Sequence, residues 1–118
     1  MTDDSSPIQS VKWVGSDRAA VVVEAGGDID LHQSARFQQA LLALLDERPK
    51  KIVVDLSGVA YMDSSGVASL VKLLARVRRN QISLILAGLT DRVRSVFEIT
   101  RLDTVFQIVA TQQEALEA

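Results

Sequence analysis

The fold is decided by residues 51–80, which read KIVVDLSGVAYMDSSGVASLVKLLARVRRN. Residues 51–56 are a short, mostly apolar run, which is typical of a parallel strand covered on both faces. We expect a loop to follow over residues 57–61. Beyond the loop, apolar side chains recur on one face of a helix, at Val67, Leu70, Val71, Leu74 and Val77. The stretch therefore predicts a buried strand, a loop and a helix that begins at Ser64 or Ser65.

The same alternation of strand and helix continues toward the C-terminus. Residues 82–87 predict a second parallel strand, and Thr90-Asp91 is placed to cap a short helix that carries Val93 and Phe97 on one side. We expect a last strand over residues 104–109. One or two helical turns should end the sequence over residues 112–118.

Toward the N-terminus the pattern predicts a hairpin and then a long helix. We expect the two hairpin strands and the tight reversal between them at residues 8–14, 19–25 and 15–18. Gly26-Gly27 is expected to break the second strand. Asp30 is placed to cap a helix over residues 31–46, which Pro49 prevents from continuing.

Strands that alternate with helices imply right-handed crossovers and hence parallel neighbours. The predicted fold class is α/β, with a mostly parallel mixed β-sheet, an antiparallel N-terminal strand and packed α-helices. A chain of 118 residues suffices for one compact domain and is short for two. We expect a flexible N-terminus at residues 1–7 and one domain over residues 8–118.

Composition excludes several classes of function. The 13 basic and 15 acidic side chains give a net charge of -2, which supplies no field to attract nucleic acid. The absence of cysteine and the single histidine argue against thiolate chemistry and against zinc sites that need sulfur. We therefore expect no metal site and no catalytic residues.

The first residues, MTDDSSP, lack the basic and apolar regions of a secretory signal. No stretch approaches the ~18 apolar residues of a membrane span. The expectation is a monomeric cytoplasmic protein without membrane insertion.

Residues 62–66, MDSSG, join the C-terminal end of the predicted strand to the N-terminus of the predicted helix. Ligands of open α/β sheets bind in such positions. Unpaired N–H groups and the helix dipole favour negative charge there, so a phosphate on Ser64 would be tolerated. That phosphate would add about -1.5 to -2 charge units beside Asp63 and change what the surface binds. Ser64 is therefore at a suitable position for a regulatory switch, in which phosphorylation changes what the surface binds.

A simpler interpretation is that Asp63 and the two serines only cap the helix. Two hydroxyls followed by a glycine exceed what a cap needs, because Gly66 costs about 0.5–1 kcal/mol relative to alanine inside a helix. We infer from Gly66 that something approaches the backbone closely.

The runs IVVDL at residues 52–56 and YMDSSGV at residues 61–67 resemble the signature of anti-sigma factor antagonists, the bacterial single-domain STAS proteins. Gly27-Asp28-Ile29-Asp30 is similar to the family's Gly-Glu-Leu/Ile-Asp step after the second strand. The order of elements matches the family over residues 8–116.

The resemblance implies a partner-switching protein. Its unphosphorylated form would bind an anti-sigma factor that is also a serine kinase and so free the sigma factor. The kinase would then phosphorylate the first hydroxyl after the aspartate, which is Ser64, and a metal-dependent serine phosphatase would reset the switch. No cofactor is implied on this chain, because ATP belongs to the kinase. The implied partner-binding residues are Asp28, Asp30, Asp63, Ser64, Ser65 and Gly66.

Three other interpretations remain open at this point. A STAS subunit of a lipid-transport or stress-signalling assembly would use the same helix face for permanent docking. His32 and Ser64 would serve as base and nucleophile in a Ser-dependent hydrolase, although no Gly-x-Ser-x-Gly elbow is present. The acids Asp28 and Asp30 suggest metal binding, but their spacing across a turn is more typical of capping.

Overall fold

The computed structural model describes residues 6–118, and the structural statements below refer to them. Most of the flexible terminus expected at residues 1–7 therefore lies outside the described part. Pro7 is buried, and its carbonyl accepts a hydrogen bond of 2.9 Å from the N–H of Gly26.

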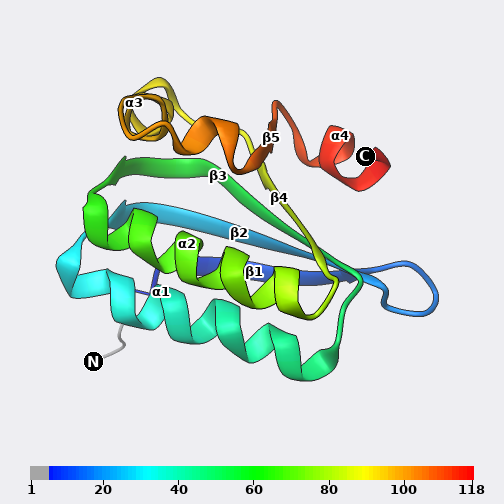
Figure 1. Cartoon of the computed structure of the whole chain (residues 1–118). Helices are drawn as coiled ribbons and strands as arrows, with labels where there is room; N and C mark the ends of the chain where they lie inside the picture. The colour runs from blue at the N-terminus through cyan, green and yellow to red at the C-terminus, as the bar shows by residue number, and fades with distance from the viewer. Residues whose placement is uncertain (1–5) are drawn as a thin grey trace.

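The described chain forms a five-stranded sheet in the order β1-β2-β3-β4-β5 with four α-helices (Figure 1). The strands are β1 (Ile8–Val14), β2 (Ala20–Ile29), β3 (Lys51–Met62), β4 (Ser83–Ala87) and β5 (Gln107–Val109). The helices are α1 (Leu31–Ala43), α2 (Ser64–Arg79), α3 (Asp91–Ile99) and α4 (Gln112–Glu117), with short 3-10 segments η1 (Leu44–Glu47) and η2 (Leu102–Thr104). Strand β1 pairs antiparallel with β2, and the other pairs are parallel. The predicted fold class is confirmed.

Helices α1 and α2 lie side by side against one face of the sheet (Figure 1). Alternate residues of the strands face these helices and join their apolar stripes in the main core, which includes Val23, Val54, Leu86, Phe37 and Leu70. The residues between them face the other way, where α4 covers Val22, Val53 and Ile85 with Ala115. Both faces of the central strands are therefore buried, as their apolar sequences require.

Strands β2 and β3 are longer than the sequence predicted. Gly26-Gly27 does not end β2, because these residues pair with Gly58 and Val59 of β3 across register shifts. A Cβ at Gly58 would lie 2.9 Å from the carbonyl of Ala25, so the missing side chain lets the two strands approach each other. The glycines mark irregularities within the strands, and the loop expected over residues 57–61 is part of β3.

Two other boundaries differ from expectation. The helix predicted over residues 31–46 is α-helical to Ala43 and then tightens into η1, which ends at Arg48 in a left-handed conformation before Pro49. The last strand covers Gln107–Val109 alone, because the segment before it winds into η2.

Candidate functional site

Two helices begin beside each other at the C-terminal ends of β2 and β3 (Figure 1). Asp30 follows β2 and caps α1 by accepting hydrogen bonds from the N–H groups of His32 and Gln33. Asp63 follows β3 and caps α2 in the same way. The paired strands thus deliver two capping carboxylates to one edge of the sheet. The cap predicted at Asp30 is confirmed, and Asp63 caps α2 as in the simpler interpretation of the motif.

Asp63 also joins the two helices. Its Oδ1 accepts from the N–H of Ser65 at 2.9 Å, the N–H of Gly66 at 3.3 Å and the hydroxyl of Ser65 at 2.5 Å. Its Oδ2 accepts from the N–H of Leu31, the first residue of α1, at 3.1 Å. One carboxylate therefore fixes where both helices start, because it satisfies N–H groups that neither helix can pair internally.

We expect acid to weaken the fold partly through Asp63. The Ser65 hydroxyl foremost, together with the N–H groups around it, holds the pKa of Asp63 below its ordinary value of 3.8. A carboxylate with a lowered folded-state pKa stabilises the fold above its ordinary pKa, and this contribution is lost as the pH falls through the folded-state pKa. The difference in free energy of unfolding between wild type and Asp63→Asn should be largest near neutral pH and shrink below about pH 4. Urea unfolding at several pH values measures it, and a difference that stays constant down to pH ~2 would contradict this role.

The two serines of the motif have different environments. Ser64 is exposed, and its hydroxyl makes no hydrogen bond within the described residues. Ser65 is half-buried, and its hydroxyl is held by Asp63. Of the two, Ser64 has the hydroxyl that is free to react with an external reagent.

Gly66 is buried, and the close approach that the sequence suggested comes from the chain itself. A Cβ at this position would lie 2.7 Å from Cγ of Met62 and 2.9 Å from the carbonyl oxygen of Ile29. Glycine here lets α2 pack directly onto the end of β2. Gly66 therefore lies beneath the exposed residues of the motif and is itself buried.

The remaining predicted residues lie around a shallow hollow next to the helix starts. Its volume is about 260 Å³, and it is lined by Ser6, Gln9, Gly26, Gly27, Asp28, Asp30 and Gln33. Asp28 is exposed and is the Cα partner of Tyr61 in the β2–β3 pairing. Asp28, Asp30, Asp63, Ser64 and Ser65 therefore occupy one end of the sheet, which we call the switch surface.

His32 is exposed, and the structure gives it no hydrogen bond to Ser64 within residues 6–118. Among the same residues, no group of three or more histidines and acidic side chains is arranged to hold a metal ion. Nor does this part of the chain contain a helix long and apolar enough to cross a membrane.

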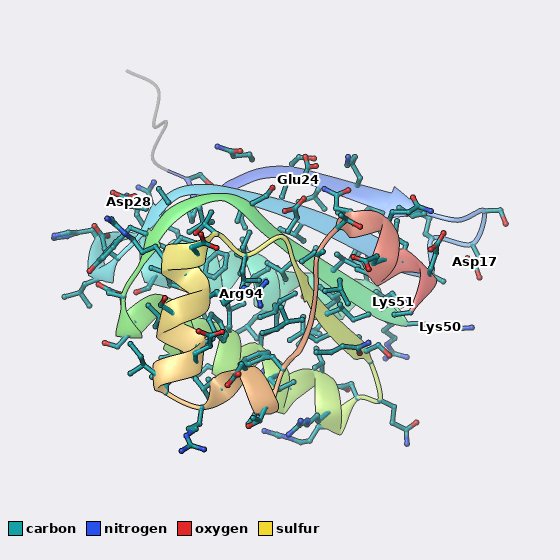
Figure 2. The ribbon with its side chains drawn as sticks, turned by 90° about the horizontal axis from the view of Figure 1, so that it is seen from above. Asp17, Glu24, Asp28, Lys50, Lys51 and Arg94 are labelled. Atoms are coloured by element: carbon teal, nitrogen blue, oxygen red, sulfur yellow. The ribbon has the colours of Figure 1, made fainter. Side chains whose placement is uncertain are left out.

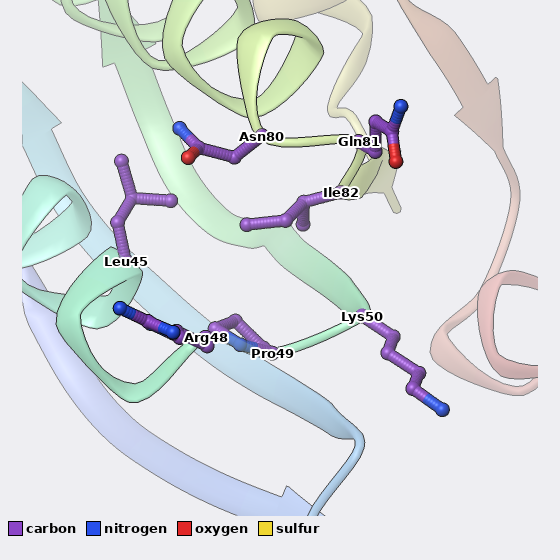
Figure 3. Close-up of a pocket in the computed structure, with 7 residues that line it drawn as sticks. All are labelled: Leu45, Arg48, Pro49, Lys50, Asn80, Gln81 and Ile82. Atoms are coloured by element: carbon purple, nitrogen blue, oxygen red, sulfur yellow. The ribbon is translucent and has the colours of Figure 1, made fainter.

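A larger hollow of about 410 Å³ lies at the opposite end of the sheet, between the connections that lead into β3 and β4 (Figure 3). Leu45, Pro49 and Ile82 line it together with Arg48 and Lys50, and Figure 3 shows the Lys50 side chain pointing away from the other lining residues. The connection into β3 follows η1, and the connection into β4 follows α2. The C-terminus of a helix carries a partial negative charge, which favours cations nearby. The helix C-termini therefore explain why Arg48 lies here, and no anionic ligand needs to be invoked for the hollow.

Sequence reasoning missed two exposed apolar side chains at the switch end of the sheet. Leu31 is 73% exposed and Tyr61 is 38% exposed. Neither residue was among the site residues predicted from the sequence. The signal for Leu31 was present, because it directly follows the predicted cap Asp30 and lies outside the apolar stripe of α1.

Comparison with known proteins identifies the family. The STAS domain model matches residues 11–115. The chain belongs to the STAS domain family. The anti-sigma-B factor antagonist of Listeria monocytogenes is 31% identical over 105 residues, which cover 89% of this chain and 92% of the relative. The protein of the same name from Staphylococcus aureus is 30% identical over 86 residues, which cover 73% and 80%.

Solved structures of STAS proteins share this fold. The unphosphorylated anti-sigma factor antagonist SpoIIAA is 22% identical, with a TM-score of 0.69 over 93% of this chain and 94% of that chain. The Bacillus SpoIIAA in its phosphorylated form is also 22% identical, with a TM-score of 0.68 over 92% and 97%. The structure of this STAS domain thus matches both forms of that protein about equally well.

Proposed function

We propose that this STAS domain is an anti-sigma factor antagonist controlled by phosphorylation of Ser64. The unphosphorylated domain binds an anti-sigma factor that is also a serine kinase, and so frees a sigma factor in the cytoplasm. The kinase transfers the γ-phosphoryl group of ATP to the Ser64 hydroxyl, whose proton is lost, and the phosphorylated domain dissociates. A metal-dependent serine phosphatase returns the domain to its binding form by hydrolysing the phosphate ester.

The observation that carries this proposal is the contrast between the two neighbouring serines. Ser64 is exposed at the first position of α2, and its hydroxyl makes no hydrogen bond to any residue that the structure describes, whereas the hydroxyl of Ser65 donates to Asp63. A phosphate on Ser64 would lie near the positive end of the α2 dipole, so the fold accommodates it. The anti-sigma-B factor antagonists among the relatives support the choice of partner.

A change of charge is sufficient for the proposed switch. Asp28, Asp30 and Asp63 already make the switch surface acidic, and a phosphate would add about -1.5 to -2 charge units among them. A partner whose cations match the unmodified surface offers no further cation for the phosphate, so the phosphate would lose its hydration in the interface without a matching charge. No rearrangement of the buried core is required. The domain acts by binding, and Ser64 is a substrate of the kinase rather than a catalytic residue.

Phosphosite mapping tests the proposal. The purified domain is incubated with Mg-ATP and the purified anti-sigma factor kinase of the same organism, and peptides are analysed by mass spectrometry. We expect one phosphate, on Ser64, in the wild type and in Ser65→Ala, and none in Ser64→Ala. Phosphate on another residue would contradict the assignment of Ser64. Stable binding without any phosphorylation would favour permanent docking in an assembly, the main alternative.

A further inference from the structure

Among the described residues, no packing contact explains why residue 31 is a leucine. Its side chain is 73% exposed at the first position of α1, whereas Phe37 and Leu41 of the same helix are completely buried. Acidic residues are favoured in the first turn of a helix, yet the first turn of α1 contains none. Neither packing nor the helix dipole therefore accounts for a large aliphatic side chain at this position.

Its position relates Leu31 directly to the proposed switch. The N–H of Leu31 donates to Oδ2 of Asp63, while Asp63 caps the helix that begins with Ser64. Leu31 and Ser64 are thus the first residues of adjacent helices, held by one carboxylate. Isolated exposed leucines are common on protein surfaces and need no explanation by themselves. This one lies beside the group whose modification is proposed to control binding.

The surroundings of Leu31 define the chemistry of a partner. Residues 26–35 and 57–71 contain three acidic side chains, Asp28, Asp30 and Asp63, and no lysine or arginine. These two segments contribute -3 to a net charge of -2, so the rest of the chain sums to +1. The charged residues nearest to Leu31 and Tyr61 along the chain on the switch surface are therefore acidic, and the first cations, Arg36 and Lys72, come more than a turn into α1 and α2. Protein interfaces commonly have an apolar centre and a polar rim.

We propose that Leu31 is the apolar anchor of the switch surface and inserts into an apolar socket on the anti-sigma factor, bordered by lysine or arginine side chains. The cations of that border meet the carboxylates around Leu31, so the partner must present both features together. This proposal rests on the proposed function and adds the residue that anchors the complex. Because Leu31 and Ser64 begin adjacent helices that Asp63 joins, a phosphate on Ser64 would have to lose its hydration beside the apolar socket, which opposes insertion of Leu31.

Calorimetric titration against the purified anti-sigma factor kinase of the same organism tests the anchor. Leu31→Ala should weaken binding of the unphosphorylated domain by about tenfold or more, whereas Leu31→Met should stay within about threefold of wild type. The matched control is Ile99→Ala at the last residue of α3, because Ile99 is 82% exposed and lies outside the switch surface. This control should bind within about twofold of wild type. Equal thermal unfolding midpoints for the four proteins would show that the fold is unchanged.

The outcomes separate the two proposals. If wild type and Leu31→Ala bind equally, the anchor is wrong and the function proposed for Ser64 stands. Equal losses in Leu31→Ala and Ile99→Ala would also overturn the anchor, because the effect would not be specific to the switch surface. If the wild type does not bind the kinase at all, the proposed function fails and the anchor fails with it.

Discussion

Ser64→Asp should weaken binding to the anti-sigma factor by about tenfold or more, which corresponds to ~1.4 kcal/mol. The substitution places a carboxylate at an exposed position next to Asp63, on a surface that is already acidic. The three existing carboxylates already pair with the cations of the partner, so an added carboxylate would be buried without a matching charge and would lose its hydration. A full phosphate, which is larger and carries more charge, should have a larger effect. Ser64→Ala should bind as the wild type does, because the hydroxyl makes no hydrogen bond within residues 6–118. Calorimetric titration of the three proteins measures the effect.

Ser16→Asp is the matched control for added charge. Ser16 is exposed in the hairpin turn between β1 and β2, where aspartate is well tolerated. Figure 2 shows the neighbouring Asp17 at one end of the molecule and Asp28, of the switch surface, at the other. Ser16→Asp should therefore leave affinity within about twofold of wild type. Equal affinities of Ser64→Asp and Ser64→Ala would refute a switch based on charge.

Gly66→Ala should destabilise the domain by about 1–3 kcal/mol. Two effects of opposite sign act at this position. Alanine is the better helix former by up to ~1 kcal/mol, which alone would stabilise α2. Its Cβ, however, would lie 2.7 Å from Cγ of Met62, 2.9 Å from the oxygen of Ile29 and 3.0 Å from Cγ2 of Ile29. The carbonyl belongs to β2 and yields little, so overpacking should exceed the gain in helix propensity.

Thermal or urea unfolding measures this effect. Lys72→Ala, at an exposed position in the same helix, controls for the propensity of alanine and should change stability by less than about 0.5 kcal/mol. A Gly66→Ala variant as stable as wild type, or more stable, would show that α2 can move away from Ile29 without loss. The packing explanation of Gly66 would then be wrong.

Local sequence signals predicted much of the fold. Asp30, Asp63 and Thr90 all accept the hydrogen bonds of a helix cap, as expected from their residue types at the starts of apolar periodic segments. The hairpin and the start of α2 were also predicted correctly. These features depend on residues within one turn or strand, so the sequence pattern contains the necessary information.

The extension of β2 and β3 depends on contacts between distant segments. Gly26-Gly27 has the composition of a strand end, and only its pairing with Gly58 and Val59 keeps it in the sheet. The same holds at the switch surface, where the bond from Leu31 to Asp63 joins residues 32 positions apart. The motif that includes Asp63 and Ser64 was evident from the sequence, whereas the link between the two helix starts required the structure.

Displacement of the sigma factor tests the central claim most directly. A preformed complex of the labelled sigma factor with its anti-sigma factor is titrated with this STAS domain, either unmodified or phosphorylated at Ser64, and fluorescence anisotropy reports the release of the sigma factor. We predict that the unmodified domain releases the sigma factor and that the phosphorylated domain requires about tenfold or more higher concentration. Equal release by both forms would contradict the account.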